Sequence, residues 1–177
     1  MTPEPPIARL FDLNRLSEAG FETTIEPGPE DRKKLAEWAD VVAVNRFLGR
    51  ILLRRLSSSR FAYSGHLEAD IEQSCTISLE PVFDTIVMDF ARELHLVPHV
   101  KKVIDISGEL SAAAGDDEVP EEIDIPRFDI AGPLLEEFLL GIDPYPKAPG
   151  ASLEVPEDEV AKLENPFAVL KALKPGG

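Results

Sequence analysis

The stretch RFAYSGHLEADIEQ, residues 60–73, contains the clearest structural pattern in the chain. Apolar and polar side chains alternate along it, with apolar residues at every second position except one: Phe61, Tyr63, Leu67, Ala69 and Ile71. Because successive side chains of a strand point to opposite faces, this period predicts a half-buried antiparallel strand with one face in water. Gly65 interrupts the apolar series and indicates a bulge or a close approach of another part of the chain.

A second alternating stretch, VFDTIVMDFARELHLV, follows at residues 82–97. The segment between the two stretches, residues 75–81, is short enough to join them as a hairpin, and Pro98 ends the second strand. The sequence therefore predicts an α+β fold with an antiparallel β-sheet built around a long central hairpin. Two or three short helices are expected to pack on this sheet, and the pattern leaves open whether the sheet closes into a barrel.

Shorter patterns predict the elements that precede the hairpin. Residues 21–26 alternate and are rich in β-branched side chains, which favours a strand. Pro29 fits the first turn of a helix, and apolar residues follow it at helical spacing: Leu35, Trp38, Ala39 and Val42. Residues 47–56 are strongly apolar and fit either a strand or a helix.

Two helices are expected after the hairpin. Asp129 is a candidate N-cap and Gly141 a candidate stop for a helix with this apolar face: Leu134, Leu135, Phe138, Leu139 and Ile142. Residues 143–149 are rich in proline and are expected to be extended or turned. Pro166 fits the first position of a short terminal helix.

The length of 177 residues and the apolar content of 44% suit one domain spanning residues 1–177. Residues 1–6 and residues 105–124 are expected to be flexible, the latter as an acidic mobile loop, and residues 150–177 form a C-terminal extension with the short helix. The chain has no apolar run of about 18 residues, so no membrane span is expected. A single cysteine and a start without signal-peptide features favour a cytoplasmic location.

The net charge of −15 is unevenly distributed along the chain. Residues 29–60 contain eight basic and four acidic residues, a net of +4, whereas residues 105–165 contain three basic and seventeen acidic residues, a net of −14. This asymmetry indicates either two distinct contact surfaces or two solvated faces.

Four arginines are the candidate contacts for RNA or for a protein partner: Arg46, Arg50, Arg54 and Arg55. The first three are spaced by four, so they share a face on a strand and also on a helix. Their guanidinium groups suit phosphate, and nearby aromatic residues suit stacking on bases. The alternative is a row of solvated arginines beside core aromatics, and the negative net charge opposes direct RNA contact.

No pattern for catalysis, metal or cofactor binding stands out. His95 and His99 have a spacing that can bind zinc on a helix, but on a strand they would lie roughly 13 Å apart, so no metal site is expected. Cys75 is either a small buried apolar residue or a nucleophile that needs a neighbouring base. The enzyme alternative is a small hydrolase, or another enzyme, with a cleft near Cys75 or His66.

Several stretches together carry a resemblance to a known family, and the most prominent are CTISLEPV at residues 75–82 and GIDPYPKAP at residues 141–149. The others are residues 41–44, residues 65–74, residues 129–130, residues 136–137 and NPFAVL at residues 165–170. Their order resembles the YceD family, the large ribosomal RNA subunit accumulation proteins, in its alphaproteobacterial-like form. The family pattern is C-x-R-C-L-x-P-V, and here Ile77 replaces the arginine and Ser78 the second cysteine. A thiol-pair or metal role for the family's cysteines therefore does not extend to this chain. The signature residues it shares with the family are Cys75, Leu79, Pro81, Asp143, Pro144 and Pro146.

The resemblance implies a non-enzymatic ribosome-biogenesis factor needed for synthesis, processing or stability of 23S rRNA. Its expected partner is large-subunit rRNA or a basic ribosomal or assembly protein, without a cofactor or a small-molecule substrate. On this hypothesis the arginines meet RNA phosphate or an acidic protein. The acidic residues 105–122 meet a basic protein or shield the arginines until a partner displaces them.

Overall fold

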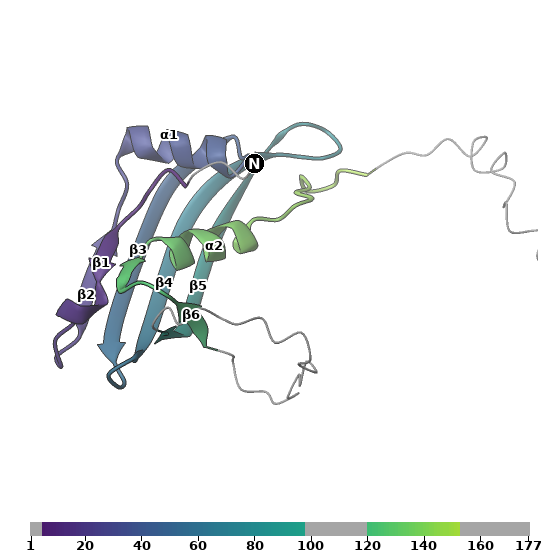
Figure 1. Cartoon of the computed structure of the whole chain (residues 1–177). Helices are drawn as coiled ribbons and strands as arrows, with labels where there is room; N and C mark the ends of the chain where they lie inside the picture. Colours follow the sequence, from purple (N-terminus) through teal and green to yellow (C-terminus); the bar gives the residue numbers. More distant parts are fainter. Residues whose placement is uncertain (1–4, 98–119, 153–177) are drawn as a thin grey trace, which may run out of the picture.

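The computed structural model describes residues 5–97 and 120–152 and shows an α+β arrangement (Figure 1). Five strands form one sheet in the order β2 (Phe21–Ile25), β3 (Ala43–Arg55), β4 (Arg60–Ser74), β5 (Pro81–Leu96) and β6 (Glu121–Ile123). Adjacent strands are antiparallel except β5 and β6, which are parallel. The remaining elements are β1 (Leu10–Asp12), which pairs with β7 (Arg127–Asp129), a 3-10 turn at Leu13–Arg15, and the helices α1 (Pro29–Trp38) and α2 (Gly132–Gly141).

The predicted central hairpin is confirmed. β4 and β5 pair from Arg60 opposite His95 to Ser74 opposite Pro81 without a register shift. The prediction placed the second strand at residues 82–97, and the structure shifts each end by one residue. The sequence did not decide whether the sheet closes into a barrel. In the structure the two outer strands of the sheet do not pair with each other, so no barrel forms.

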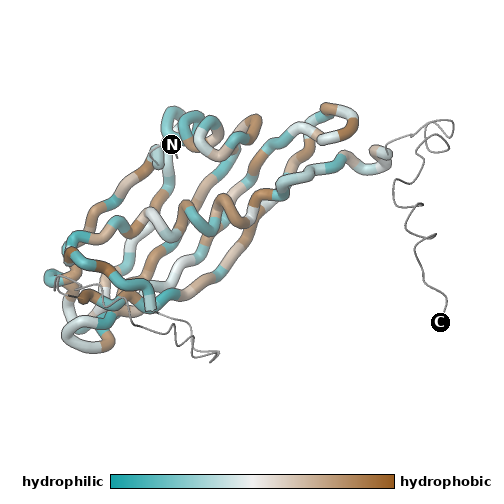
Figure 2. Tube along the Cα trace, turned by 45° about the vertical axis from the view of Figure 1, so that its right-hand side comes forward, coloured by the Kyte–Doolittle hydropathy of each residue, from teal (hydrophilic) through white to brown (hydrophobic). Residues whose placement is uncertain are grey.

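Alternation along the strands divides the sheet into two faces, and Figure 2 shows the corresponding exchange of apolar and polar colours along the strands. The inner face carries the residues that are fully buried, including Phe47, Phe61 and Leu67. Helix α2 packs on this face, and Phe138 meets the ring of Phe47 edge-on with 5.4 Å between ring centroids. Each such apolar side chain contributes about 1.5–3 kcal/mol through its removal from water.

Gly65 is the position where a neighbouring side chain approaches the strand backbone. A Cβ atom at this position would lie 2.3 Å from Cζ of Phe90, whose ring lies over the glycine. The close-approach alternative is therefore confirmed, and the bulge occurs instead in β3, between Val44 and Arg46.

The helices begin and end near the predicted residues. Pro29 is the first residue of α1 as predicted, but the helix ends at Trp38, and Val42 lies beyond it and is exposed. The expected N-cap of α2 was wrong by two residues, because Ala131 occupies that position. The carboxylate of Asp129 instead accepts hydrogen bonds from the N–H groups of Arg9, at 2.7 Å, and Ala131, at 3.0 Å.

The expectation of an acidic mobile loop at residues 105–124 was wrong in one part, because strand β6 lies within that range. The N–H of Val97 donates to the carbonyl of Ile123 at 2.9 Å. The end of β5 therefore supplies backbone hydrogen-bond partners for β6, and this pairing does not depend on the side chains of β6. Residues 47–56, left as strand or helix, belong to β3 except the last residue. Several expectations lie outside the described residues: residues 1–4, residues 105–119, His99 and the terminal helix.

Within residues 5–97 and 120–152, neither helix has the length and apolar character needed to cross a lipid bilayer.

Candidate functional site

The face of the sheet opposite α2 is the first candidate site, and we call it the open face. The prediction that Arg46, Arg50 and Arg54 share one face is confirmed, since all three project from this side of β3 and are exposed. In Figure 1, α2 lies across the other side of β3, β4 and β5. The described part of the chain places no helix over the open face.

Arg55 does not belong to this row of arginines. It follows Arg54 directly on a strand, so its side chain points to the inner face. Its guanidinium donates to the carbonyls of Leu13, at 2.8 Å, and Leu16, at 3.2 Å, and lies 5.1 Å from the ring centroid of Phe61. Arg55 therefore holds the N-terminal segment against the sheet and is not available to a partner.

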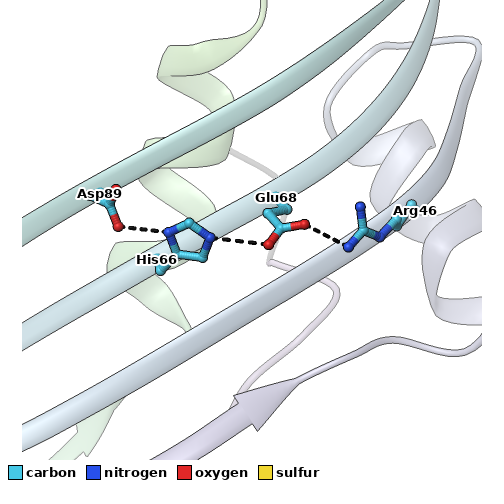
Figure 3. Close-up of polar contacts among 4 residues, drawn as sticks. All are labelled: Arg46, His66, Glu68 and Asp89. Atoms are coloured by element: carbon cyan, nitrogen blue, oxygen red, sulfur yellow. Dashed lines mark hydrogen bonds and ion pairs between the residues drawn. The ribbon is translucent and has the colours of Figure 1, made fainter.

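Figure 3 shows a chain of polar contacts that crosses three strands of the open face. Arg46 donates to Glu68 at 2.6 Å, His66 Nε2 lies 3.2 Å from Glu68, and His66 Nδ1 lies 2.6 Å from Asp89. Hydrogen bonds to Asp89 and Glu68 raise the pKa of His66 above its ordinary value, and those from His66 and Arg46 lower the pKa of Glu68. The four side chains carry balanced charge when His66 is protonated, so Arg46 is engaged within the sheet.

We expect His66 to titrate above 6.5, its ordinary value, because two carboxylates favour the imidazolium. Replacing Asp89 with asparagine should lower the pKa, since it removes the largest cause of the shift. A pKa raised by folding adds stability that is complete below pH 6.5 and is lost as pH rises through the folded-state value. NMR titration of the imidazole measures the pKa, and Glu22→Gln, elsewhere on this face, is the control. A wild-type pKa at or below 6.5 would contradict the prediction.

The second candidate site is the contact between residues 75–81 and residues 143–148, which we call the signature contact. Sγ of Cys75 accepts hydrogen bonds from the N–H groups of Ile77, Ser78 and Ala148, at 3.4, 3.3 and 3.3 Å. The N–H of Thr76 donates to the carbonyl of Pro146 at 2.9 Å, and its hydroxyl donates to the same oxygen at 3.2 Å. The two most prominent stretches of the resemblance therefore lie side by side.

Other signature residues shape the same region. Leu79 has a left-handed backbone, with φ of 62°, and is exposed, whereas Pro81 begins β5. The carbonyl of Asp143 accepts from Gln73 at 2.9 Å, and its carboxylate accepts from the N–H of Tyr145 at 2.8 Å. Pro144 and Pro146 line a depression of about 400 Å³ with residues of the loop after α1 and of the end of β4.

Cys75 is fully buried, and its sulfur accepts hydrogen bonds from three backbone N–H groups. Hydrogen bonds from Ala148 and Ser78 and, more weakly, from Ile77 lower the pKa of the thiol from 9.0 to about 6, against the opposing effect of desolvation. The lowered pKa favours the thiolate form, and the sulfur serves as the acceptor that joins the two stretches.

Replacing Cys75 with alanine should lower the thermal midpoint by roughly 5 °C at pH 8, because three N–H groups lose their acceptor. The depressed thiol pKa contributes stability that is present above pH 9 and is lost as pH falls through about 6. The difference between wild type and variant should therefore shrink from pH 9 to pH 5. Calorimetry across that range measures it, with Ser74→Ala on the neighbouring exposed position as the control. A difference that does not depend on pH would contradict the thiolate.

The structure does not bring Cys75 and His66 together. His66 lies within β4, whereas Cys75 follows the last residue of that strand, nine residues further along the chain and roughly 30 Å away. His95 lies opposite Arg60, at the far end of the hairpin from Cys75. No cluster of three potential metal ligands occurs among the residues that the structure describes.

Sequence reasoning missed both the polar chain and the role of Cys75. Alternation could place His66 and Glu68 on the wet face of one strand, but their partners Arg46 and Asp89 depend on the register of the adjacent strands. Comparison with protein-family models, with curated proteins and with solved structures found no match.

Proposed function

We propose that this chain is a non-enzymatic ribosome-biogenesis factor that supports accumulation of large-subunit ribosomal RNA in the cytoplasm. The observation that carries the proposal is the signature contact, in which two stretches far apart in sequence are joined through Cys75 and Thr76. These are the two most prominent of the stretches on which the resemblance to the YceD family rests. Their contact supports treating them as one unit of structure rather than as two chance matches.

The open face supports a binding role and favours a protein partner over bare RNA. Among the described residues, Arg50 and Arg54 have no carboxylate within ion-pair distance, whereas Arg46 is held by Glu68. These two arginines are four residues apart on β3, about 13 Å along the strand, and their guanidinium groups suit carboxylate or phosphate. The same face carries Glu22 and Asp70, and the net charge of −15 repels a polyanion. We therefore place the chain as an adaptor that holds a protein bound to the rRNA.

Depletion of the protein followed by measurement of mature large-subunit rRNA tests the function. The expected result is a fall in mature 23S rRNA that wild-type protein restores. Unchanged 23S rRNA after depletion would overturn the proposal.

A double variant, Arg50→Ala/Arg54→Ala, tests the open face in the same cells. Its control is the double variant Lys33→Ala/Lys34→Ala on α1. The control variant also removes two exposed positive charges. A difference between the two variants would therefore come from the position of the charges and not from their number. Binding of purified protein to 23S rRNA and to ribosomal proteins at two salt concentrations then separates the partners. Loss of protein binding alone supports the adaptor, and loss of rRNA binding alone contradicts it.

A further inference from the structure

The outer edge of β5 is a long row of backbone groups without a neighbouring strand in the described part of the chain. Strand β5 runs from Pro81 to Leu96, but β6 pairs only with Leu94, His95 and Leu96. Figure 1 shows β5 at the margin of the sheet with β6 at one end of it. Folded proteins usually shorten, cover or twist such an edge, because it is a template for pairing with another chain.

The hydrogen bonds at the end of β5 show which residues face outward. The N–H of Leu96 donates inward to the carbonyl of Ser59, and the N–H of Val97 donates outward to the carbonyl of Ile123. Backbone groups alternate along a strand, so odd-numbered residues present their N–H and C=O groups to the free edge. One of these, the N–H of Thr85, already donates to the carboxylate of Asp84 at 2.8 Å. Phe83, Val87 and Ala91 carry outward N–H groups with no such partner among the described residues.

Exposed apolar side chains accompany this edge. Phe83 is 69% exposed and Val87 is 60% exposed, and both project from the open face, about 13 Å apart. A strand added beside β5 would place its own alternate side chains next to them, as in cross-strand pairs within a sheet. The occupant that fits is therefore an extended segment with apolar residues at alternate positions.

Charge selects among the possible occupants. Carboxylates border the edge on both faces, with Asp89 82% exposed on the open face and Glu136 62% exposed on the inner face. The cation beside them, Arg92, is held by Glu136 and Glu137. A second copy of a chain with net charge −15 would bring like charges together, whereas lysine or arginine in the added strand would meet opposite charge.

We propose that the free edge of β5 binds an extended segment of a basic protein as an additional strand of the sheet. Backbone hydrogen bonds would supply affinity, Phe83 and Val87 would select apolar side chains on the open face, and Glu136 would favour basic side chains on the inner face. This inference rests on the proposed function in one respect, since that function makes a basic ribosomal or assembly protein the expected partner. It adds to it the location and the mode of binding.

Fluorescence anisotropy with a labelled decapeptide of five Lys-Val repeats tests the edge directly. Val87→Pro removes one outward N–H and leaves the pairing with β4 intact, because proline is tolerated on edge strands. Val87→Thr keeps the N–H and the β-branched shape and is the matched control. We expect wild type to bind, Val87→Thr to bind less than about threefold more weakly through lost apolar contact, and Val87→Pro to bind at least roughly tenfold more weakly. A Lys-Pro repeat of equal charge should bind at least roughly tenfold more weakly to wild type.

Amide hydrogen exchange supplies a readout that does not depend on the variant folding. Binding of the Lys-Val peptide should protect the N–H groups of Phe83, Val87 and Ala91 in the wild-type protein. Equal binding of the Lys-Val and Lys-Pro peptides, or no added protection in β5, would overturn the proposal in favour of nonspecific charge attraction. Protection of the β5 N–H groups that appears without peptide and rises with protein concentration would also overturn the proposal. It would show that a second copy of the chain pairs with this edge.

The two proposals can fail separately. If depletion leaves 23S rRNA unchanged while the peptide protects β5, the edge site stands and the ribosomal function falls. If depletion lowers 23S rRNA but the peptide does not protect β5, the function stands and the edge site falls.

Discussion

Replacing Gly49 with valine should destabilise the protein by about 3 kcal/mol, a large part of the stability of a domain of this size. Gly49 lies on the inner face of β3 beneath α2 and is buried. A Cβ atom there would lie 2.1 Å from Cδ2 and 3.1 Å from Cγ of Leu134. Leu134 is itself fully buried, so it has no solvent into which to move. Urea unfolding measures the effect as a lower midpoint.

Two comparisons make this prediction specific. Gly65→Val should cost less, because the Phe90 ring over Gly65 is only half-buried and can turn toward solvent. Leu134→Ala should partly offset Gly49→Val, so the double variant should lose less stability than the sum of the single variants. Strictly additive losses of stability in the double variant, or an unchanged urea midpoint for Gly49→Val, would show that α2 does not pack on β3 in this way.

Replacing Phe138 with alanine should cost about 3–5 kcal/mol, the range for large aromatic side chains in cores. Phe138 is fully buried in α2 and its ring contacts Phe47. The cavity left behind would lie between the helix and the centre of the sheet. Leu140→Ala on the same helix is the control, because Leu140 is 75% exposed and should change stability by less than about 0.5 kcal/mol. Equal effects of the two variants in urea unfolding would contradict the packing of α2 described above.

The elements that follow from local patterns were predictable from sequence. The hairpin was identified because alternation over residues 60–73 and 82–97 needs no knowledge of the rest of the fold. Pro29 marked the start of α1 for the same reason, since its ring suits the first helical position. Grouping Arg55 with Arg54 was an avoidable error, because the same alternation places adjacent residues on opposite faces once a strand is assumed.

Tertiary contacts explain what the sequence could not predict. Asp129 was placed as a helix cap from its neighbours, but it accepts a hydrogen bond from Arg9, 120 residues earlier. Strand β6 forms at the end of β5 although its residues have no alternating apolar pattern. Cys75 gains its acceptor role from Ala148, 73 residues later, and no local spacing reports that contact.

The order of the elements along the chain has a consequence for synthesis. Strands β2 to β5 are consecutive and can form the meander once residue 96 has left the ribosome, since each pairs with its neighbour in sequence. The helix that covers the inner face ends at residue 141. At about 5–20 residues per second, the apolar face of the nascent sheet stays uncovered for roughly 2 to 9 s. During that interval we expect the growing chain to be prone to aggregation, and arresting translation between these residues should yield chains that aggregate more readily than the finished protein.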